Sequence, residues 1–501
     1  MNDKMKDSLM KKRQDFLIFT FDLLAVFFTY SMFIRKHFSI DSYMVYYNMD
    51  PDNQIRQTRL VNYVLIKLFE VIGFNTCKYQ SILTGIFIVV AAFSVLFLTK
   101  IFLKYAEKLT LVKIITVNLA ILIFVINIYI LEWFLYPESM LFYAISLFFA
   151  VFAVGIIDLN GKFFVRYFVA TIFLLISLNC YQASMPIYVI YGVTLLWVKN
   201  KFTLTQKAFF ESFCVIFSAG FSSVCILIEQ RIAANFGAIF QSDRGAKFSL
   251  EIIINNINTV FNESKRIFSG YNFLPKYIIP LFIICVFTII IYAFIKDRSR
   301  FNQYLYLVLV INTNFFIVLL PHIITKIVWF APRTIVGMGA FLSTIVIIAI
   351  YKSKSDIIYK ISAIISALFI LFNYVQIQDV GINHFANNVL ENEYSVLIQD
   401  EINEYEKKTG NKITSIASVN DENPQYNYRG VKYTIFDTNV KAFIAKWGTP
   451  YLIGYYNDRN YNMTDMNEKV YNDNFKGKDW EKFEPEEQLV FIENTLYICI
   501  Y

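Results

Sequence analysis

The sequence predicts a polytopic α-helical membrane protein with about eleven transmembrane helices. Three observations lead to this fold class: 56% of the 501 residues are apolar, they come in blocks of about 20, and basic residues gather in every second loop between the blocks. A single soluble core buries only a limited amount of apolar surface. Blocks of this length match the hydrocarbon thickness of a bilayer, where a spanning backbone must be helical because lipid offers it no hydrogen-bond partner.

The spans can be placed in order along the chain. The first apolar block, residues 16–34, follows three basic residues, and no small-residue cleavage site comes after it, so we expect an uncleaved first helix. Residues 1–15 are then a cytoplasmic tail and residues 16–374 the transmembrane domain. Further spans are expected near residues 81–98, 111–131, 140–157, 167–179, 185–198, 208–228, 277–295, 304–320, 334–350 and 357–374.

The charge of the loops predicts the orientation. Cytoplasmic loops of membrane proteins carry an excess of Lys and Arg, and here short basic loops alternate with loops that are not basic. This alternation predicts a multi-pass protein of the cell (inner) membrane with its N-terminus inside and its C-terminus outside. The residues that define the inner loops are Lys100, Lys104, Lys108, Lys162, Arg166, Lys199, Lys201, Lys207, Lys296, Arg298, Arg300, Lys352 and Lys354.

Two of the expected outer loops are long, covering residues 35–80 and 229–276. Each contains a stretch, at 60–72 and at 252–261, in which apolar residues recur at i, i+3 and i+4. This spacing is typical of an amphipathic helix that lies on the membrane surface.

Beyond the last span the composition becomes polar and acidic. Residues 375–501 contain 20 acidic and 12 basic residues, although the whole chain has a formal net charge of +7. We expect a small α+β domain outside the cell, with a helix at 385–408 and strands at 413–418, 431–435 and 450–455. Residues 489–501 are expected to form a hairpin that turns at Glu493 and Asn494.

Several function classes find no support in the sequence. No GxxxxGK[ST] or GxGxxG motif cradles a nucleotide, and the positive charge sits in short loops, where it sets orientation rather than binding nucleic acid. The six cysteines have no CxxC spacing and the three histidines form no HExxH motif, so no metal site is predicted. Asp50-Pro51-Asp52 is similar to a DxD metal motif, but a turn is favoured. A divalent cation remains open, without a clear ligand motif.

Polar and aromatic residues gather at the outer ends of the spans. Any one of them has the simple explanation that outer loops are polar, but acids, arginines and aromatic residues on one face are typical of a site. The candidates are Asp41, Arg56, Arg59, Glu138, Tyr181, Gln182, Lys326, Trp329 and Arg333.

These residue types suit the transfer of a sugar that is carried by a lipid phosphate. A phosphate leaves readily, so the site needs no general acid, but it needs cations that hold the phosphate: Arg59 and Arg333, with Arg56 and Lys326 as further candidates. It also needs a carboxylate that takes the proton of the acceptor hydroxyl, and Asp41, close to the end of the first span, is the candidate. The residues expected to contact substrate are Glu138, Tyr181, Gln182 and Trp329.

The same residues resemble a known family, the phage and bacterial glucosyltransferases that modify O-antigen, within the C-type glycosyltransferase superfamily. The resemblance implies hexosyl transfer from a polyprenyl-phosphate sugar to a cell-surface polysaccharide or lipid-linked glycan at the outer face of the membrane. Where the family usually shows paired acids and a Gly-Arg pair, this chain has Ser42 after Asp41 and Thr58 before Arg59. The similar motifs are Ser39-Ile40-Asp41-Ser42-Tyr43, Gln57-Thr58-Arg59-Leu60-Val61, Tyr136-Pro137-Glu138, Tyr181-Gln182 and Ala331-Pro332-Arg333.

Three other functions stay open on the sequence. A polysaccharide polymerase or ligase also places arginines in outer loops, but such enzymes rarely end in an acidic α+β domain. A transporter or flippase of lipid-linked glycans typically has its site at the bilayer midplane on broken helices, whereas the polar cluster here is expected at one surface. A non-enzymatic scaffold for envelope assembly is the third.

Overall fold

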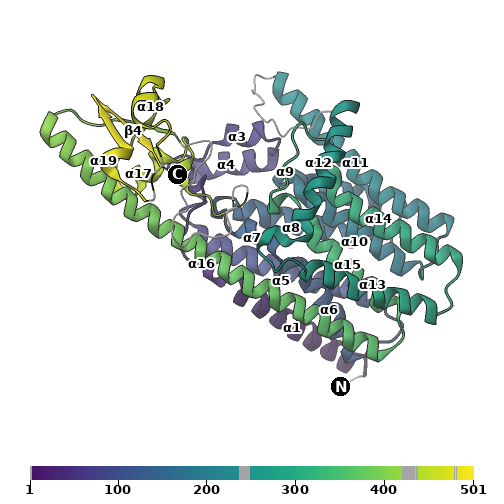
Figure 1. Ribbon diagram of the computed structural model, residues 1–501. Coiled ribbons are helices and arrows are strands. Elements are labelled where there is room, and N and C mark those ends of the chain that lie inside the picture. Colours follow the sequence, from purple (N-terminus) through teal and green to yellow (C-terminus); the bar gives the residue numbers. More distant parts are fainter. Residues whose placement is uncertain are drawn as a thin grey trace.

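The computed structural model describes residues 3–235, 249–419, 435, 438–478, 480 and 482–500. The protein is a bundle of helices, with one very long helix along its side and a small β-sheet at the far end of that helix (Figure 1). The expected apolar blocks are mostly helical, and the block at 111–131 is divided between the two helices α6 and α7. The helices of the bundle are α1 (Asp3–Tyr30), α5 (Gln80–Leu103), α6 (Leu111–Val125), α7 (Ile128–Phe134), α8 (Met140–Ile157), α9 (Phe163–Cys180), α10 (Met185–Lys199), α11 (Gln206–Asn235), α13 (Ile278–Lys296), α14 (Phe301–Ile323), α15 (Gly337–Lys352) and α16 (Asp356–Thr409).

Within the described residues, eight helices are long and apolar enough to cross a membrane. The pair α6 and α7, bent by 53°, would make nine, and α15 is a shorter apolar helix. The protein is therefore a helical membrane protein, while the count of about eleven spans stays a prediction.

A single asparagine makes the bend between α6 and α7. Asn127 has an extended backbone, and its Oδ1 accepts hydrogen bonds from the backbone N–H groups of Tyr129 (2.9 Å) and Ile130 (3.1 Å), which caps α7. Its Nδ2 donates to the carbonyl oxygens of Ile123 and Phe124 at the end of α6. One side chain thus binds backbone N–H groups at the start of α7 and carbonyl oxygens at the end of α6, so the break between the helices can be buried.

The loops predicted to lie outside carry short helices and the two predicted amphipathic helices. These are α4 (Leu60–Ile72) and α12 (Leu250–Phe268), and both leave large apolar side chains exposed, among them Val71 and Phe261. Exposed apolar faces of this kind suit the membrane surface. The short elements are η1 (Ser31–Ile34), α2 (Ser42–Tyr47), α3 (Pro51–Arg56), η2 (Pro137–Ser139), η3 (Gln182–Ser184), η4 (Gly270–Asn272) and η5 (Pro332–Thr334).

The last span and the predicted helix at 385–408 are one continuous helix. α16 has 54 residues and ends at Gly410, which adopts a left-handed conformation with φ 79°. The only glycine of the sequence near the expected break, Gly381, lies against η1, where an added Cβ would be 2.4 Å from Met32 Sδ. The glycine thus allows close packing instead of ending the helix.

The C-terminal part has a four-stranded mixed sheet in the order β2-β1-β4-β3. β1 (Ser415–Val419) pairs in parallel with β2 (Asn462–Met463) and β4 (Thr495–Cys499), while β3 (Leu489–Ile492) and β4 form the predicted hairpin. The predicted strand at 450–455 is wrong, because these residues lie in helix α17 (Thr449–Asn457), which has Pro450 in its first turn. The predicted strand at 431–435 lies outside the described residues apart from Ile435. The remaining elements are η6 (Ala442–Ile444), α18 (Glu468–Asn474) and α19 (Pro485–Gln488).

The C-terminal part, here called the C-terminal domain (residues 410–500), and α16 hold the start of the predicted first outer loop. Asn388 on α16 bonds both backbone groups of Phe38, at 2.8 and 3.0 Å. Buried Glu391 accepts hydrogen bonds from the Tyr43 hydroxyl (2.8 Å) and the Ala442 N–H (2.7 Å). The segment that carries Asp41 is therefore fixed between the bundle and the C-terminal domain.

Candidate active site

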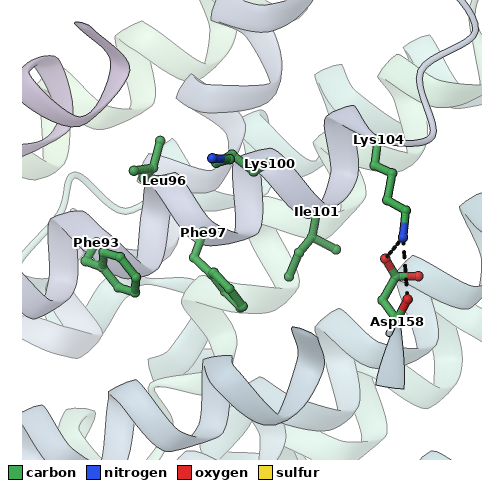
Figure 2. A pocket seen from close by; sticks show the side chains of 7 residues that line it. All are labelled: Phe93, Leu96, Phe97, Lys100, Ile101, Lys104 and Asp158. Carbon is green, nitrogen blue, oxygen red and sulfur yellow. Dashed lines mark hydrogen bonds and ion pairs between the residues drawn. The ribbon is translucent and has the colours of Figure 1, made fainter. Parts of the chain in front are cut away.

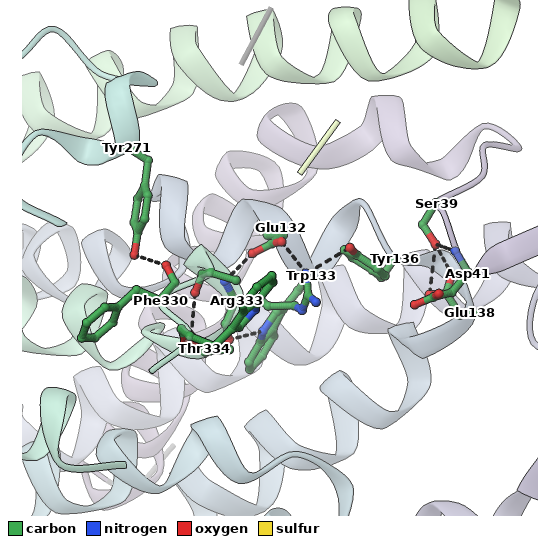
Figure 3. Close-up of polar contacts among 12 residues, drawn as sticks. Ser39, Asp41, Glu132, Trp133, Tyr136, Glu138, Tyr271, Phe330, Arg333 and Thr334 are labelled. Atoms are coloured by element: carbon green, nitrogen blue, oxygen red, sulfur yellow. Dashed lines mark hydrogen bonds and ion pairs between the residues drawn. The ribbon is translucent and has the colours of Figure 1, made fainter. Parts of the chain in front are cut away.

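Two carboxyl groups from different predicted outer loops meet at one end of the bundle. Asp41 occupies the N-cap position of α2, and Glu138 lies in η2, where it is only 7% exposed. The Ser42 hydroxyl donates to Glu138 at 2.6 Å, and the Ser39 hydroxyl is 3.2 Å from both oxygens of the same carboxyl group. Figure 3 shows Asp41 beside Glu138, and the two acids interact electrostatically.

The serines around Asp41 explain how the first-loop motif works. The Ser39 Oγ also accepts the backbone N–H of Asp41 at 3.2 Å, so the loop is tied to Glu138 on both sides of Asp41. Ser42, the residue after Asp41, binds a carboxylate from another loop. The second acid beside Asp41 is thus supplied by Glu138, a partnership that sequence reasoning missed.

The Arg59 side chain is a partly buried cation without a described counter-charge. Its guanidinium lies over the Tyr181 ring at 5.1 Å, and its buried Nε has no hydrogen-bond partner. Within the described part of the chain, no carboxylate lies at ion-pair distance from it. Burial lowers the pKa of Arg59, with nearby Tyr181 and Tyr143 opposing the shift and the charge of Arg333 adding to it. An uncompensated buried charge is costly, so an anionic ligand would be stabilised here.

Arg333, in η5, is held by an acid. Its Nη1 donates to Glu132 Oε1 at 2.5 Å and to the Tyr136 hydroxyl at 3.0 Å, and its backbone N–H donates to the other Glu132 oxygen at 2.6 Å. The Trp133 indole N–H donates to the Arg333 carbonyl at 3.2 Å, as Figure 3 shows. Glu132 is 1% exposed, so this pair is a buried connection between α7 and η5.

Tyr143 on α8 lies between the acidic and the basic residues. Its ring stacks on Trp133 with 4.8 Å between centroids and meets the Tyr181 ring edge-on at 4.9 Å. It interacts electrostatically with Arg59, Arg333 and Glu138. The structure thus brings Asp41, Glu138, Tyr181, Arg59 and Arg333 to one end of the bundle, around a tyrosine that the sequence did not single out.

The other sequence candidates have different surroundings. The Gln182 side chain donates to the Gln57 and Thr58 carbonyl oxygens at 3.0 and 3.1 Å. Thr58 has a φ of 57°, so Gln182 holds an unusual turn directly before Arg59. Arg56 ends α3 and is partly buried. Exposed Lys326 and partly buried Trp329 precede η5 in the chain.

A metal site is not apparent in the part of the chain that the structure describes. No three His, Cys, Asp or Glu side chains there gather in a way that could hold a metal ion. In the DxD-like motif, Asp50 Oδ1 accepts the backbone N–H groups of Asp52 (3.0 Å) and Asn53 (3.2 Å). Asp50 is thus the N-cap of α3, as the turn interpretation requires.

The family model described as glucosyl transferase GtrII matches residues 30–344. The chain belongs to the GtrII glucosyltransferase family. It is therefore a glycosyltransferase of the family that modifies O-antigen, as the resemblance of the outer-loop motifs predicted. No curated protein and no solved structure matches the chain.

The family match contains each acid and arginine of the site, but it stops before α16 and the C-terminal domain. Within the described residues, a hydrogen bond from outside this GtrII region reaches Asp41. The indole N–H of Trp447 donates to Asp41 Oδ1 at 3.2 Å. The C-terminal domain therefore takes part in the surroundings of Asp41.

A separate groove of about 320 Å³ lies at the opposite end of α5 (Figure 2). Lys104 donates to Asp158 there at 2.8 Å. Gln80, at the other end of α5, lies next to His37 of the first outer loop, and a helix of this length places its two ends about 30 Å or more apart. The groove is thus not part of the site of this GtrII-family protein. Its lining is Phe93, Leu96, Phe97, Lys100, Ile101, Lys104 and Asp158.

Proposed function

We propose that this protein transfers a hexose from a polyprenyl-phosphate sugar to a cell-surface polysaccharide or a lipid-linked glycan at the outer face of the cell membrane. The observation that carries the proposal is the partly buried Arg59 guanidinium, whose buried Nε has no hydrogen-bond partner and which, close to Arg333 and Asp41, has no described carboxylate partner. A lipid phosphate would supply the missing negative charge.

Each residue of the site has its own role in the proposed reaction. The acceptor hydroxyl oxygen attacks the anomeric carbon of the donor sugar, the bond from that carbon to the phosphate oxygen breaks, and the phosphate keeps the electron pair. Asp41 takes the hydroxyl proton. Arg59 binds the phosphate and stabilises its growing negative charge. Arg333, whose position is fixed by Glu132, adds positive potential.

The position of Arg59 suits a donor that arrives from the membrane. Arg59 is the N-cap residue of α4, whose side chains Val64, Leu68 and Val71 are exposed. An apolar face of this kind lies at the boundary between headgroups and acyl chains. The phosphate of a polyprenyl lipid would meet the guanidinium at the same depth.

Substitution of Asp41 tests the proposed base. Asp41→Asn keeps the size of the side chain and an oxygen that can accept the Trp447 N–H, but the amide does not take a proton. Loss of a general base costs about 10²- to 10⁴-fold in rate. Sugar transfer to the surface glycan is measured in membranes that contain equal amounts of wild-type and variant protein.

Asp50→Asn is the matched control, because asparagine also caps a helix well and α3 should stay intact. Near-normal transfer by Asp41→Asn together with loss of transfer by Asp50→Asn would show that the base is misassigned. Composition analysis of the glycan from cells that lack the gene adds an independent readout. A missing side-branch sugar supports the proposal, and a shortened chain supports a polymerase instead.

A further inference from the structure

An exposed tryptophan stands beside the candidate base. Trp447 precedes α17 and is 44% exposed, while its indole N–H donates to Asp41 Oδ1 at 3.2 Å. By contrast, the rings of Trp133, Trp197 and Trp480 are buried. Large aromatic side chains that remain exposed next to a reactive group often mark a binding surface.

The backbone holds Trp447 in place. The N–H of Gly448 donates to the Ala445 carbonyl at 2.8 Å, and the Thr449 hydroxyl donates to the same carbonyl at 3.1 Å. A Cβ added at Gly448 would lie 3.1 Å from the carbonyl oxygen of Ile40. The residue after Trp447 thus packs directly against the residue before Asp41, so the exposed ring belongs to a tight contact between the two segments.

Further tyrosines extend the aromatic surface away from Asp41. Tyr451 lies four residues after Trp447, and its ring centroid is 6.0 Å from that of Tyr47, which is 38% exposed at the end of α2. Both α2 and α17 therefore carry a tyrosine ring, with its polar hydroxyl group, where the two helices meet. Rings of this kind combine an apolar face with a hydrogen-bonding edge.

We propose that Trp447 is the stacking platform for the acceptor glycan and that the C-terminal domain selects this acceptor. The inference rests on the proposed function and names where its second substrate binds. The acceptor hydroxyl must lie within hydrogen-bond distance of the Asp41 carboxylate. Because the Trp447 N–H bonds the same carboxylate, a sugar that presents its hydroxyl to Asp41 would lie next to the indole.

The chemistry of the surface fits a sugar ring better than the lipid phosphate. A pyranose has apolar C–H faces and a polar rim, which match the faces of the indole and its N–H edge. The indole carries no charge that would hold a phosphate, and the unneutralised arginine of the site is Arg59 on α4. Donor and acceptor are thus bound by different parts of the chain, the donor by the GtrII region and the acceptor with help from the C-terminal domain.

Binding and kinetic measurements on the full-length protein in detergent test the proposal. The acceptor probe is the polysaccharide isolated from cells that lack the gene, and the donor-side probe is polyprenyl phosphate. We expect Trp447→Ala to weaken polysaccharide binding about 10- to 100-fold, the range for loss of an aromatic anchor, and to leave polyprenyl-phosphate binding unchanged. We expect Trp447→Phe to keep most of the polysaccharide affinity and to lower kcat, because the ring remains but Asp41 loses its N–H partner.

Trp480→Phe is the matched control, since Trp480 also donates its indole N–H to a carboxylate, Glu487, at 2.8 Å, within a separate cluster of the C-terminal domain. It should bind both probes like the wild type. Unchanged polysaccharide binding by Trp447→Ala, in a preparation whose wild type transfers sugar, would overturn the inference and leave the proposed function standing. If Trp447→Ala weakened the binding of both probes equally, the inference would also be overturned. This result is expected for a ring that only anchors the domain to the membrane. A wild type that binds the polysaccharide but transfers no sugar from a polyprenyl-phosphate donor would instead contradict the proposed function.

Discussion

At the scale of single residues, the two arginines of the site differ in what neutralises them. Arg333 is paired with Glu132, whereas the described neighbours of Arg59 are the rings of Tyr181 and Tyr143, the Cys180 thiol and a second cation, Arg333. We expect Arg59→Met to lower kcat/KM for the donor about 10- to 100-fold, the equivalent of one or two charged hydrogen bonds. Arg59→Lys should recover part of this loss, because it keeps the charge but not the planar fork that binds phosphate. Initial rates at varied donor concentration measure both effects.

Lys67→Met is the control for Arg59. Lys67 lies on the same helix α4 and forms an exposed pair with Glu70 at 3.1 Å, so its removal should change donor kinetics little. If Arg59→Met left the donor kinetics unchanged, the phosphate would have to bind elsewhere.

Sequence reasoning found the site residues that lie in short motifs and missed the contacts between distant parts of the chain. Asp41, Arg59 and Arg333 lie in short motifs, so type and position suffice to select them. The bond from Ser42 to Glu138 and the bond from Trp447 to Asp41 join positions 96 and 406 residues apart, and no spacing rule relates them. Such contacts depend on tertiary packing, which local patterns do not encode.

At the scale of elements, the close contact between α15 and the bend of α6 and α7 positions Glu132. An added Cβ at Gly339 would lie 2.5 Å from Asn127 Nδ2 and 3.0 Å from the Phe124 carbonyl oxygen. We therefore expect Gly339→Ala to destabilise the protein by about 1–3 kcal/mol through overpacking. Since α7 carries Glu132, transfer activity should fall as well. Thermal unfolding and transfer rates of the purified variant measure the two effects.

Gly220→Ala is the matched control at this scale. Gly220 lies inside helix α11, and an added Cβ there would meet no atom within 4 Å. Because alanine is the better helix former, this variant should be as stable as the wild type or more stable by up to about 1 kcal/mol. Equal stability of the Gly339→Ala variant and the wild type would show that the contact at the bend is loose.

Sequence patterns predicted the apolar helices well and the C-terminal elements less well. Long apolar blocks have one stable form in lipid, so their helices follow directly from composition. The segment at 450–455 has both aromatic and aliphatic residues, which favour a strand, but Leu452 and Ile453 become buried on a helix that packs against Phe38 and Tyr43. Tertiary packing overrides a weak local preference in such short segments.

At the scale of the whole molecule, the predicted inner loops meet at one end of the bundle. Asp158, after α8, pairs with Lys104 after α5 at 2.8 Å and with Lys199 at the end of α10 at 3.5 Å. Asp297 after α13 pairs with Lys352 at the end of α15 at 2.6 Å. These are loops that the charge pattern assigned to the same side of the membrane.

The predicted outer loops meet at the other end. Glu132 with Arg333, Ser42 with Glu138, and Gln182 with Thr58 each connect two different loops of that set. The alternation of charge along the sequence thus matches the alternation of ends in the structure. This match does not say which end of the bundle faces the cytoplasm. We expect the end with the basic loops to face the cytoplasm.

Reporter fusions at three positions answer this question. We expect a fusion after Lys108 to report the cytoplasm, and fusions after Val375 and after Tyr501 to report the outside. The C-terminal fusion retains the complete α16 and the sheet, whereas the fusion after Val375 interrupts α16, so agreement of the two shows that truncation does not change the orientation. The basic loops contain thirteen Lys and Arg residues at the sequence positions named above, and each one left on the outer side would oppose insertion.

A cytoplasmic signal from the Tyr501 fusion would place Asp41, Arg59 and Trp447 inside the cell, because Trp447 bonds Asp41 directly. Transfer at the outer face would then be ruled out, while the assignment of the residues to one site would remain.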